Sequence, residues 1–296
     1  MSNATAQPLF VFSIPLIPRE RANDWPTVTR HLQLTLQSLN QQTDPEWIAV
    51  ICGHEAPKLP EPKDTRIHVL ETPDFPIEPI ERGSTDKYRK RRHIASWLRQ
   101  QKVKSAIVFG LDADDWVHKD FVQQCKAQIT PEARGLLVDS GYRVDFRSGF
   151  GELITSSFHR GCGSCFIGLF QRRDLPKHSN DGKCTYSRIA CGHHARQGER
   201  AEKYGWQINK LSTPLIAYTI NHSESLRGMK TGGKLRKIMP HRQNVNPRKL
   251  RVLLRHEFGV NPVLGSLPLS TRMRSGVDAI WHHAKKRIKK TPSFKE

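Results

Sequence analysis

The sequence predicts an α/β fold, in which a sheet of mainly parallel strands is flanked by helices. One observation behind this prediction is the order of segments in residues 8–111, where apolar strand-like runs alternate with amphipathic stretches as β-α-β-β-α-β. That order favours parallel strands joined by crossover connections. A second observation is the stretch Ile107–Leu111, which is apolar on both faces, as the central strands of such sheets are. The 296 residues are enough for one large α/β domain with an appendage.

The strands expected in this first part are short apolar runs bounded by prolines, glycines or charged residues. Pro15 and Pro18 stop the first run, and a Pro-rich loop over residues 54–64 separates the second from the third. The predicted strands are residues 8–15, 47–53, 66–70 and 107–111.

Two helices are expected between these strands. Residues 28–41 carry leucines at helical spacing and are therefore predicted to form an amphipathic helix. Residues 86–98 form a second helix with a strongly basic first half and an apolar later face. The basic half is either a solvated surface or a phosphate-binding face, to which Lys87 and one of Arg91 or Arg92 would contribute.

The stretch Asp112-Ala113-Asp114-Asp115 places three carboxylates directly after the central strand. Ligands bind at the carboxyl ends of the strands in open α/β sheets. Carboxylates this close repel one another unless a cation lies among them, and Mg²⁺ or Mn²⁺ commonly binds one or two carboxylates together with substrate phosphates. The alternative is an Asp-rich turn that caps the following helix.

The second half of the chain continues the same pattern less clearly. A helix is expected to run from the His193-His194 pair to about Tyr204, with Gly205 as its C-cap. Further strands are predicted at residues 135–144 (as one long strand or a pair), 165–170, 206–211 and 215–220.

The net charge of +20 is unevenly distributed. Residues 226–296 hold 18 Lys and Arg against 3 Asp and Glu, so +15 of the charge lies there, and residues 1–225 are close to balanced. We therefore divide the chain into a main domain, 1–225, and a basic lid and helical C-terminal extension, 226–296. Helical periodicity at residues 247–258 and 272–290 suits either amphipathic helices on an anionic membrane surface or solvated helices packed on the main domain.

No apolar run approaches the roughly 18 residues of a transmembrane helix, and the N-terminus lacks a signal-peptide pattern. We expect a soluble, cytoplasmic protein, in which the six cysteines are thiols. A zinc site is the alternative, because Cys162 and Cys165 form a CxxC pair. The later pair, Cys184 and Cys191, is more widely spaced than structural zinc sites usually are.

Three pieces of the first half occur in a recognisable order. They are Ser13-Ile14-Pro15 at the end of the first strand, Leu36-Gln37-Ser38-Leu39-Asn40-Gln41-Gln42-Thr43 in the first helix, and Asp112-Ala113-Asp114-Asp115 after the central strand. With this order and spacing, residues 9–130 resemble the GT-A glycosyltransferases, specifically the large inverting family often called family 2. The resemblance implies a GT-A (Rossmann-like) mixed sheet flanked by helices, outside which the basic extension would lie.

The resemblance implies a hexosyl- or deoxyhexosyltransferase that moves a sugar from a nucleotide-sugar donor to a glycan or lipid-linked acceptor, with inversion. Polysaccharide biosynthesis would be its setting, and Mn²⁺ or Mg²⁺ its cofactor. The implied site residues are Asp114, Asp115 and His222 for the metal, and Pro15, Arg19, Lys87, Arg91 and Asp112 for the donor, with Asp112 near the ribose.

The chain departs from the family's pattern at two places. The second strand ends in Cys52-Gly53-His54-Glu55, where the family uses an acidic run to hold the nucleotide base, so the base preference is left open. The acidic pair that supplies the family's general base falls on His193-His194. Histidine is a competent base near neutral pH, so His194 is the predicted base and His193 the lesser candidate. The alternatives are a polar helix start or a metal-binding pair.

Two other classes of function remain open from the sequence. The net charge suggests a nucleic-acid-binding protein, although no helix-turn-helix, finger or RNA-binding strand motif is present. The second of these classes is a catalytically idle GT-A fold used for binding, which the missing acidic pair permits. The basic extension has three ordinary partners, namely nucleic acid, an anionic membrane surface and an acidic polymer, and the charge alone does not choose among them. We expect no nucleic acid and consider a peripheral contact with the anionic inner face of the membrane.

Overall fold

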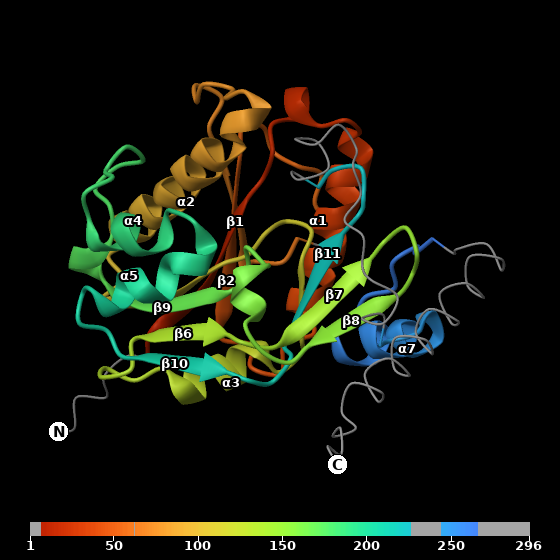
Figure 1. Cartoon of the computed structure of the whole chain (residues 1–296). Coiled ribbons are helices and arrows are strands. Elements are labelled where there is room, and N and C mark those ends of the chain that lie inside the picture. Colours follow the sequence, from red (N-terminus) through yellow and green to blue (C-terminus); the bar gives the residue numbers. More distant parts are fainter. Residues whose placement is uncertain (1–6, 62, 226–243, 266–296) are drawn as a thin grey trace, which may run out of the picture.

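The computed structural model describes residues 7–61, 63–225 and 244–265. The main sheet consists of β1 (Leu9–Pro15), β2 (Trp47–Gly53), β3 (Ile67–Glu71), β4 (Ser105–Gly110), β6 (Gly135–Val138), β9 (Phe166–Gln171) and β10 (Ile208–Leu211). Their order is β10-β6-β9-β4-β1-β2-β3 (Figure 1). Strands β1 to β4 are mutually parallel, whereas β9 runs antiparallel to β4 and to β6. The predicted α/β fold with a mixed sheet is confirmed.

Helices cover both faces of the main sheet. They are α1 (Trp25–Asn40), α2 (Gly83–Gln100), α3 (Phe121–Gln128), α4 (Thr185–Ala190) and α5 (Gln197–Glu202). Successive side chains of a strand point to opposite faces. In β1, Phe10 and Phe12 therefore belong to the buried cluster on the side of α1 and α3, while Val11 belongs to the cluster on the opposite side, which residues of α2, α4 and α5 complete. All three are completely buried, so β1 lies at the centre of the core.

A second, smaller sheet stands beside the main one. It contains β5 (Trp116–Val117), β7 (Gly141–Asp145), β8 (Gly151–Ile154) and β11 (Ile216–Ile220) in the order β5-β11-β7-β8. Helix α7 (Pro247–Glu257) covers it, with Leu250 and Leu254 buried in a cluster that includes Trp116 and Phe258. The apolar face of α7 is thus part of the core.

The observed elements differ from the predicted ones in places where tertiary pairing decides the structure. Residues 135–144 form two strands, which belong to different sheets. The helix expected up to Tyr204 is a 3₁₀ turn, His194–Arg196, followed by the short α5. The sequence did not indicate α4, β5 or β8. The predicted helix at residues 272–290 lies outside the described residues.

The described residues contain no helix that combines the length and the apolar character needed to cross a membrane.

The packing of α7 predicts a difference between two substitutions on that helix. Leu254→Ala should lower the free energy of unfolding by about 2–5 kcal/mol, because it leaves a cavity in the core. Val252→Ala, at a side chain that is 55% exposed, should change it by less than about 0.5 kcal/mol. Urea denaturation measures both, and equal small effects would contradict the placement of α7 in the core.

Candidate active site

An acidic turn, Asp112–Asp115, leaves the carboxyl end of β4 beside the end of β1. The two strands are parallel neighbours, and the Leu111 N–H extends their pairing by donating to the Ser13 carbonyl at 3.1 Å. From α1, the Thr35 hydroxyl lies 2.8 Å from the Ala113 carbonyl and 3.0 Å from the Asp115 carbonyl. The backbone of the turn is therefore fixed by hydrogen bonds from α1. Its three carboxylates are held at the carboxyl ends of the strands, where ligands of such sheets bind.

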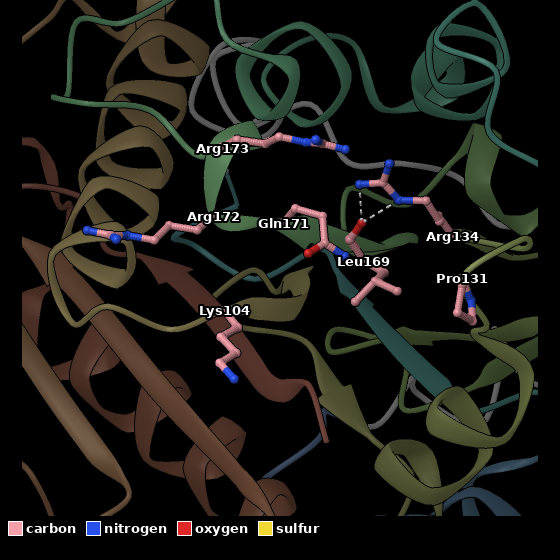
Figure 2. Close-up of a pocket in the computed structure, with 7 residues that line it drawn as sticks. All are labelled: Lys104, Pro131, Arg134, Leu169, Gln171, Arg172 and Arg173. Carbon is pink, nitrogen blue, oxygen red and sulfur yellow. Dashed lines mark hydrogen bonds between the residues drawn. The ribbon is translucent and has the colours of Figure 1, made fainter. Parts of the chain in front are cut away.

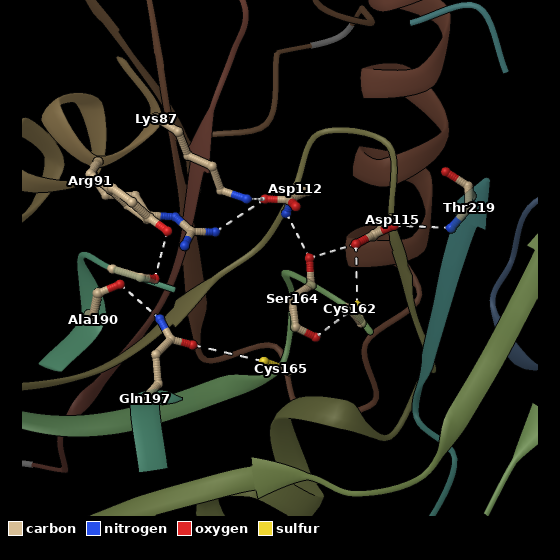
Figure 3. A network of polar contacts seen from close by, with 12 residues as sticks. Lys87, Arg91, Asp112, Asp115, Cys162, Ser164, Cys165, Ala190, Gln197 and Thr219 are labelled. Carbon is tan, nitrogen blue, oxygen red and sulfur yellow. Dashed lines mark hydrogen bonds and ion pairs between the residues drawn. The ribbon is translucent and has the colours of Figure 1, made fainter. Parts of the chain in front are cut away.

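Asp112 is paired with two cations from α2. Its Oδ1 contacts Nζ of Lys87 and lies 3.2 Å from Nη2 of Arg91 (Figure 3). Arg91 is buried and passes close to β4, where a Cβ at Gly110 would stand 2.7 Å from the Arg91 Cζ atom. Glycine at position 110 thus gives the guanidinium its path to Asp112. The predicted donor residues Lys87, Arg91 and Asp112 form one cluster.

Asp114 has a histidine partner. Its Oδ2 lies 2.9 Å from Nε2 of His222, which follows β11. Burial opposes ionisation, but the hydrogen bond and charge of His222 hold the pKa of Asp114 below its ordinary value. The ring of His31 from α1 lies 4.4 Å from that of His222. Burial, together with the charge of His222, lowers the pKa of His31 to about 4, so His31 is neutral at physiological pH.

Asp115 is fully buried and faces protein donors with both carboxylate oxygens. Oδ2 accepts from the Ser164 hydroxyl at 2.7 Å and the Cys162 thiol at 3.8 Å, and Oδ1 accepts from the Thr219 N–H at 3.1 Å (Figure 3). Ser164 also accepts from the Asp112 N–H at 2.9 Å. Burial and the neighbouring carboxylates raise the pKa of Asp115 well above its usual range. This side chain joins the acidic turn to the 162–165 loop and to β11.

The histidine pair lies next to the cations of the Asp112 cluster. The rings of His193 and His194 are stacked at 4.8 Å, and the Tyr88 hydroxyl of α2 donates to the Gly192 carbonyl just before them at 2.6 Å. Burial lowers the pKa of His194 to about 4, and the charges of Lys87 and His193 contribute to the shift. His194 is therefore an unprotonated imidazole at neutral pH.

Two predicted donor residues stand apart from this cluster. Pro15 ends β1 opposite Cys52 of β2. The Arg19 N–H donates to Oε1 of Glu55 at 2.6 Å, and its side chain is exposed. Neither residue contacts the acidic turn through a hydrogen bond or ion pair between described residues. Their role at the donor stays a prediction.

The end of β2, where the sequence departs from its family, is closed by paired groups. His54 is buried, with Nε2 3.0 Å from the Phe75 carbonyl oxygen. Beside it, the fully buried Nζ of Lys90 donates to the Leu16 carbonyl at 2.6 Å and to Oδ2 of Asp86 at 2.8 Å. This ammonium therefore connects α2 to the residue that follows β1, and its charge is already paired with Asp86.

A metal site must be assembled from few side chains. In the described ranges, no group of three or more His, Cys, Asp or Glu side chains is placed to hold a metal ion. All six cysteines are free thiols, and burial raises the pKa of Cys165 to about 12. The groups that fit a divalent cation are Asp114, whose side chain is 29% exposed, and the adjacent His222. Mg²⁺ or Mn²⁺ bound there would complete its shell with phosphate and water oxygens.

Sequence reasoning missed several contacts of the acidic turn. His31 and Thr35 could have been found, because they are polar residues in the otherwise apolar stripe of α1. Ser164 lies inside the CxxC segment that was considered for zinc, and its polarity was the available signal. Nothing local in the sequence indicates that the backbone of Thr219 reaches Asp115.

Comparison with protein-family models gives a match over most of the chain. Residues 29–242 match the model of a family described as "Putative rhamnosyl transferase". Among solved structures, the chain is similar to a "putative nucleotide-diphospho-sugar transferase" from Desulfovibrio desulfuricans G20, with 8% identity, 72% of this chain and 81% of that chain covered, and a TM-score of 0.32. The chain is also similar to mouse xyloside xylosyltransferase 1 in its apo form, with 8% identity, 79% of this chain and 86% of that chain covered, and a TM-score of 0.28. No curated protein matches the chain.

The Asp115 contacts predict a stability difference between two substitutions. Asp115→Ala leaves buried donors without an acceptor and should lower the free energy of unfolding by about 2–4 kcal/mol. Asp115→Asn keeps an acceptor for the Thr219 N–H and can donate to Ser164, so it should cost roughly half as much or less.

Urea denaturation again provides the measurement. Asp74→Ala removes an exposed carboxylate and serves as the control, with an expected change within about 0.5 kcal/mol. If Asp115→Ala behaved like this control, Asp115 would not hold the turn.

Proposed function

The chain belongs to the rhamnosyl transferase family whose model spans residues 29–242, and from that premise we propose that it transfers rhamnose, or a related deoxyhexose, from a nucleoside diphosphate to an acceptor hydroxyl. That it is a glycosyltransferase confirms the resemblance noted in the sequence. The proposal adds that the acceptor is a glycan or a lipid-linked sugar, that polysaccharide biosynthesis is its setting, and that the anomeric carbon is inverted.

The observation that carries this proposal is the convergence of Lys87 and Arg91 on Asp112. A buried guanidinium and a partly exposed ammonium, both at the carboxyl end of β4, suit the two phosphates of a sugar nucleotide. Ligands of α/β sheets bind at this edge. In this arrangement Asp112 would keep the two cations in place, and we propose that it lies near the ribose of the donor.

The proposed metal ion, Mn²⁺ or Mg²⁺, would be held by Asp114 and His222, which lie 2.9 Å apart. When bound, it would supply Lewis-acid stabilisation of the negative charge on the leaving diphosphate. Asp115, the third predicted ligand, faces Ser164 and Thr219 in this structure, so we assign it the support of the turn.

His194 is the proposed general base, which takes the proton of the acceptor hydroxyl. Its pKa of about 4 keeps the imidazole unprotonated and able to accept a proton. A base this weak is a poor match to neutral pH. The negative charge of a diphosphate bound at Lys87 would counter one of the charges that lower this pKa and make His194 a stronger base.

A catalytically idle, donor-binding protein is the second candidate. The absence of a carboxylate at positions 193 and 194 and the low pKa of His194 favour it. Incubation with rhamnose activated by dTDP, UDP or GDP separates the two candidates, because a transferase slowly hydrolyses its donor even without an acceptor. Binding without hydrolysis or transfer would leave the idle fold as the answer.

We also propose a cytoplasmic protein that touches the anionic inner face of the membrane through its basic C-terminal region. Within the described part of that region, α7 buries its apolar face in the core and exposes Arg248, Arg251 and Arg255. The contact through α7 would then be electrostatic rather than inserted. Salt-sensitive sedimentation with anionic vesicles tests it.

The donor site predicts metal-linked nucleotide binding. With Mn²⁺ present, a nucleoside diphosphate at 100 times its Kd should stabilise the protein by about 2.7 kcal/mol, seen as a higher melting temperature. Asp114→Asn should abolish the Mn²⁺-dependent part of this shift because it removes the carboxylate that pairs with His222. Asp74→Asn, which neutralises an exposed carboxylate, is the matched control and should keep the full shift.

Two outcomes would count against the proposed metal site. One is a shift of the same size after removal of divalent ions, which would leave Lys87 and Arg91 as the sole phosphate ligands. The other is an unchanged metal dependence in Asp114→Asn.

The assignment of His194 predicts a specific pH profile. Since the pKa of His194 in the free protein is lowered from 6.5 to about 4, kcat/KM should hold its value below pH 6.5 and fall only as the pH approaches 4. His194→Ala should lower kcat by about 10²–10⁴-fold, whereas His193→Ala at the exposed neighbour should have a much smaller effect. An acid limb centred near pH 6.5, or full activity in His194→Ala, would remove His194 from the role of base.

A further inference from the structure

A basic hollow opens at the edge of the main sheet opposite the acidic turn. It has a volume of about 480 Å³ and is lined by Lys104, Pro131, Arg134, Leu169, Gln171, Arg172 and Arg173 (Figure 2). Lys104 immediately precedes β4, and the acidic turn follows the other end of that strand. At about 3.3 Å per strand residue, the hollow and the candidate active site are roughly 20 Å apart. The hollow is therefore a separate site.

Four of the seven lining residues are cations and none is acidic. Two acidic residues adjoin lining residues in the chain. Glu132, next to Pro131, is exposed, and its side chain forms a hydrogen bond with Thr130. Asp174 is buried, and its Oδ2 accepts from Nη2 of Arg134 at 2.5 Å and from the Gln171 N–H at 2.9 Å. Asp174 thus compensates Arg134 alone. The side chains of Lys104 and Arg173 make no hydrogen bond or ion pair with other described residues, and both are exposed. Cations gathered without counter-charges repel one another, so an anion among them is favoured.

Arg134 gives the hollow a preformed binding group. Its Nε and Nη2 both donate to the Leu169 carbonyl, at 3.1 and 2.9 Å (Figure 2), and its guanidinium lies over the ring of Trp206 at 4.3 Å. Nη1 makes no hydrogen bond to the described residues. A guanidinium fixed in this way loses little freedom on binding and suits the planar or forked oxygens of carboxylates and phosphates.

The lining also argues against other anionic partners. The large exposed hydrophobic residues among those described, Tyr204, Val252 and Val263, do not line the hollow, so no large apolar side chain is exposed there to insert into a membrane. Single-stranded nucleic acids bind with their bases stacked on aromatic rings, but no aromatic side chain lines it, and Arg134 covers a face of Trp206. The volume lies in the range of small-ligand pockets and would hold one or two sugar units.

We propose that this hollow is a second binding site, which takes a sugar unit bearing a carboxylate or phosphate within an acidic glycan chain. The anion and sugar chemistry follow from the lining residues. The choice of a glycan chain as the carrier rests on the proposed glycosyltransferase function. Bound there, a chain would be held by the protein at a distance from the donor site.

Calorimetric titration of the full chain with a galacturonic-acid tetrasaccharide, in the absence of donor and metal, tests the site. The double variant Lys104→Ala/Arg173→Ala should weaken binding at least 10-fold, because it removes two cations that make no other contact. Arg251→Ala/Arg255→Ala on α7 loses the same charge from exposed positions and should change affinity by less than 2-fold. Donor hydrolysis should be unaffected in both variants.

Four results would overturn the proposal. They are equal weakening in the two double variants, equal affinity for neutral maltotetraose, equal affinity for inorganic phosphate, and tighter binding of a dT10 oligonucleotide. Because the titration contains no donor, it is independent of turnover. A failure of the proposed transferase activity would leave the binding result intact, and loss of tetrasaccharide binding would leave the donor site untouched.

Discussion

Mutual repulsion of three carboxylates within four residues is the constraint on which this structure depends. The acidic turn meets it in three different ways, one for each aspartate. Asp112 is paired with Lys87 and Arg91, Asp114 is paired with His222, and the pKa of Asp115 is raised by burial. Each solution recruits a different part of the chain. The turn is consequently the point where α2, β11 and the 162–165 loop are joined to β4.

These separate partners of the three aspartates also explain how the second sheet is attached to the main sheet. β5 continues directly from the acidic turn and pairs antiparallel with β11, whose Thr219 donates its N–H to Asp115 at 3.1 Å and its hydroxyl to the Asp114 carbonyl at 2.8 Å. The same strand leads into His222, the partner of Asp114. Backbone and side-chain contacts thus fix the second sheet to the turn at one place. A change in the charge state of the turn would alter its hydrogen bonds to Thr219 of β11, and so act on the sheet that α7 covers.

The sequence was sufficient for elements with strong local patterns and insufficient for those made by distant contacts. Strand β2 was predicted with its observed bounds, and α1 and α7 nearly so, because their apolar spacing is regular. Strands β5 and β8 have two and four residues and form only because a partner strand is near, which no local pattern reveals. The sequence identified the acidic turn but not the contacts that Asp115 makes with Ser164 and Thr219. Ser164 follows the turn by about fifty positions, and their contact requires the antiparallel β9, which the strand order did not predict.

The cations at the two ends of the main-sheet strands differ in how they are paired with carboxylates. At the carboxyl ends of the strands, Lys90 pairs with Asp86, and Lys87 and Arg91 share Asp112, so each of these cations has a carboxylate partner. At the opposite edge, Arg134 is the only cation lining the basic hollow that pairs with a carboxylate of the described residues, Asp174. A diphosphate bound at the first edge would replace a carboxylate as the partner of paired cations, whereas an anion in the hollow would meet cations that have no carboxylate partner to displace. The two edges of the main sheet therefore differ in how their cations are paired, which is the physical basis for proposing a different ligand at each.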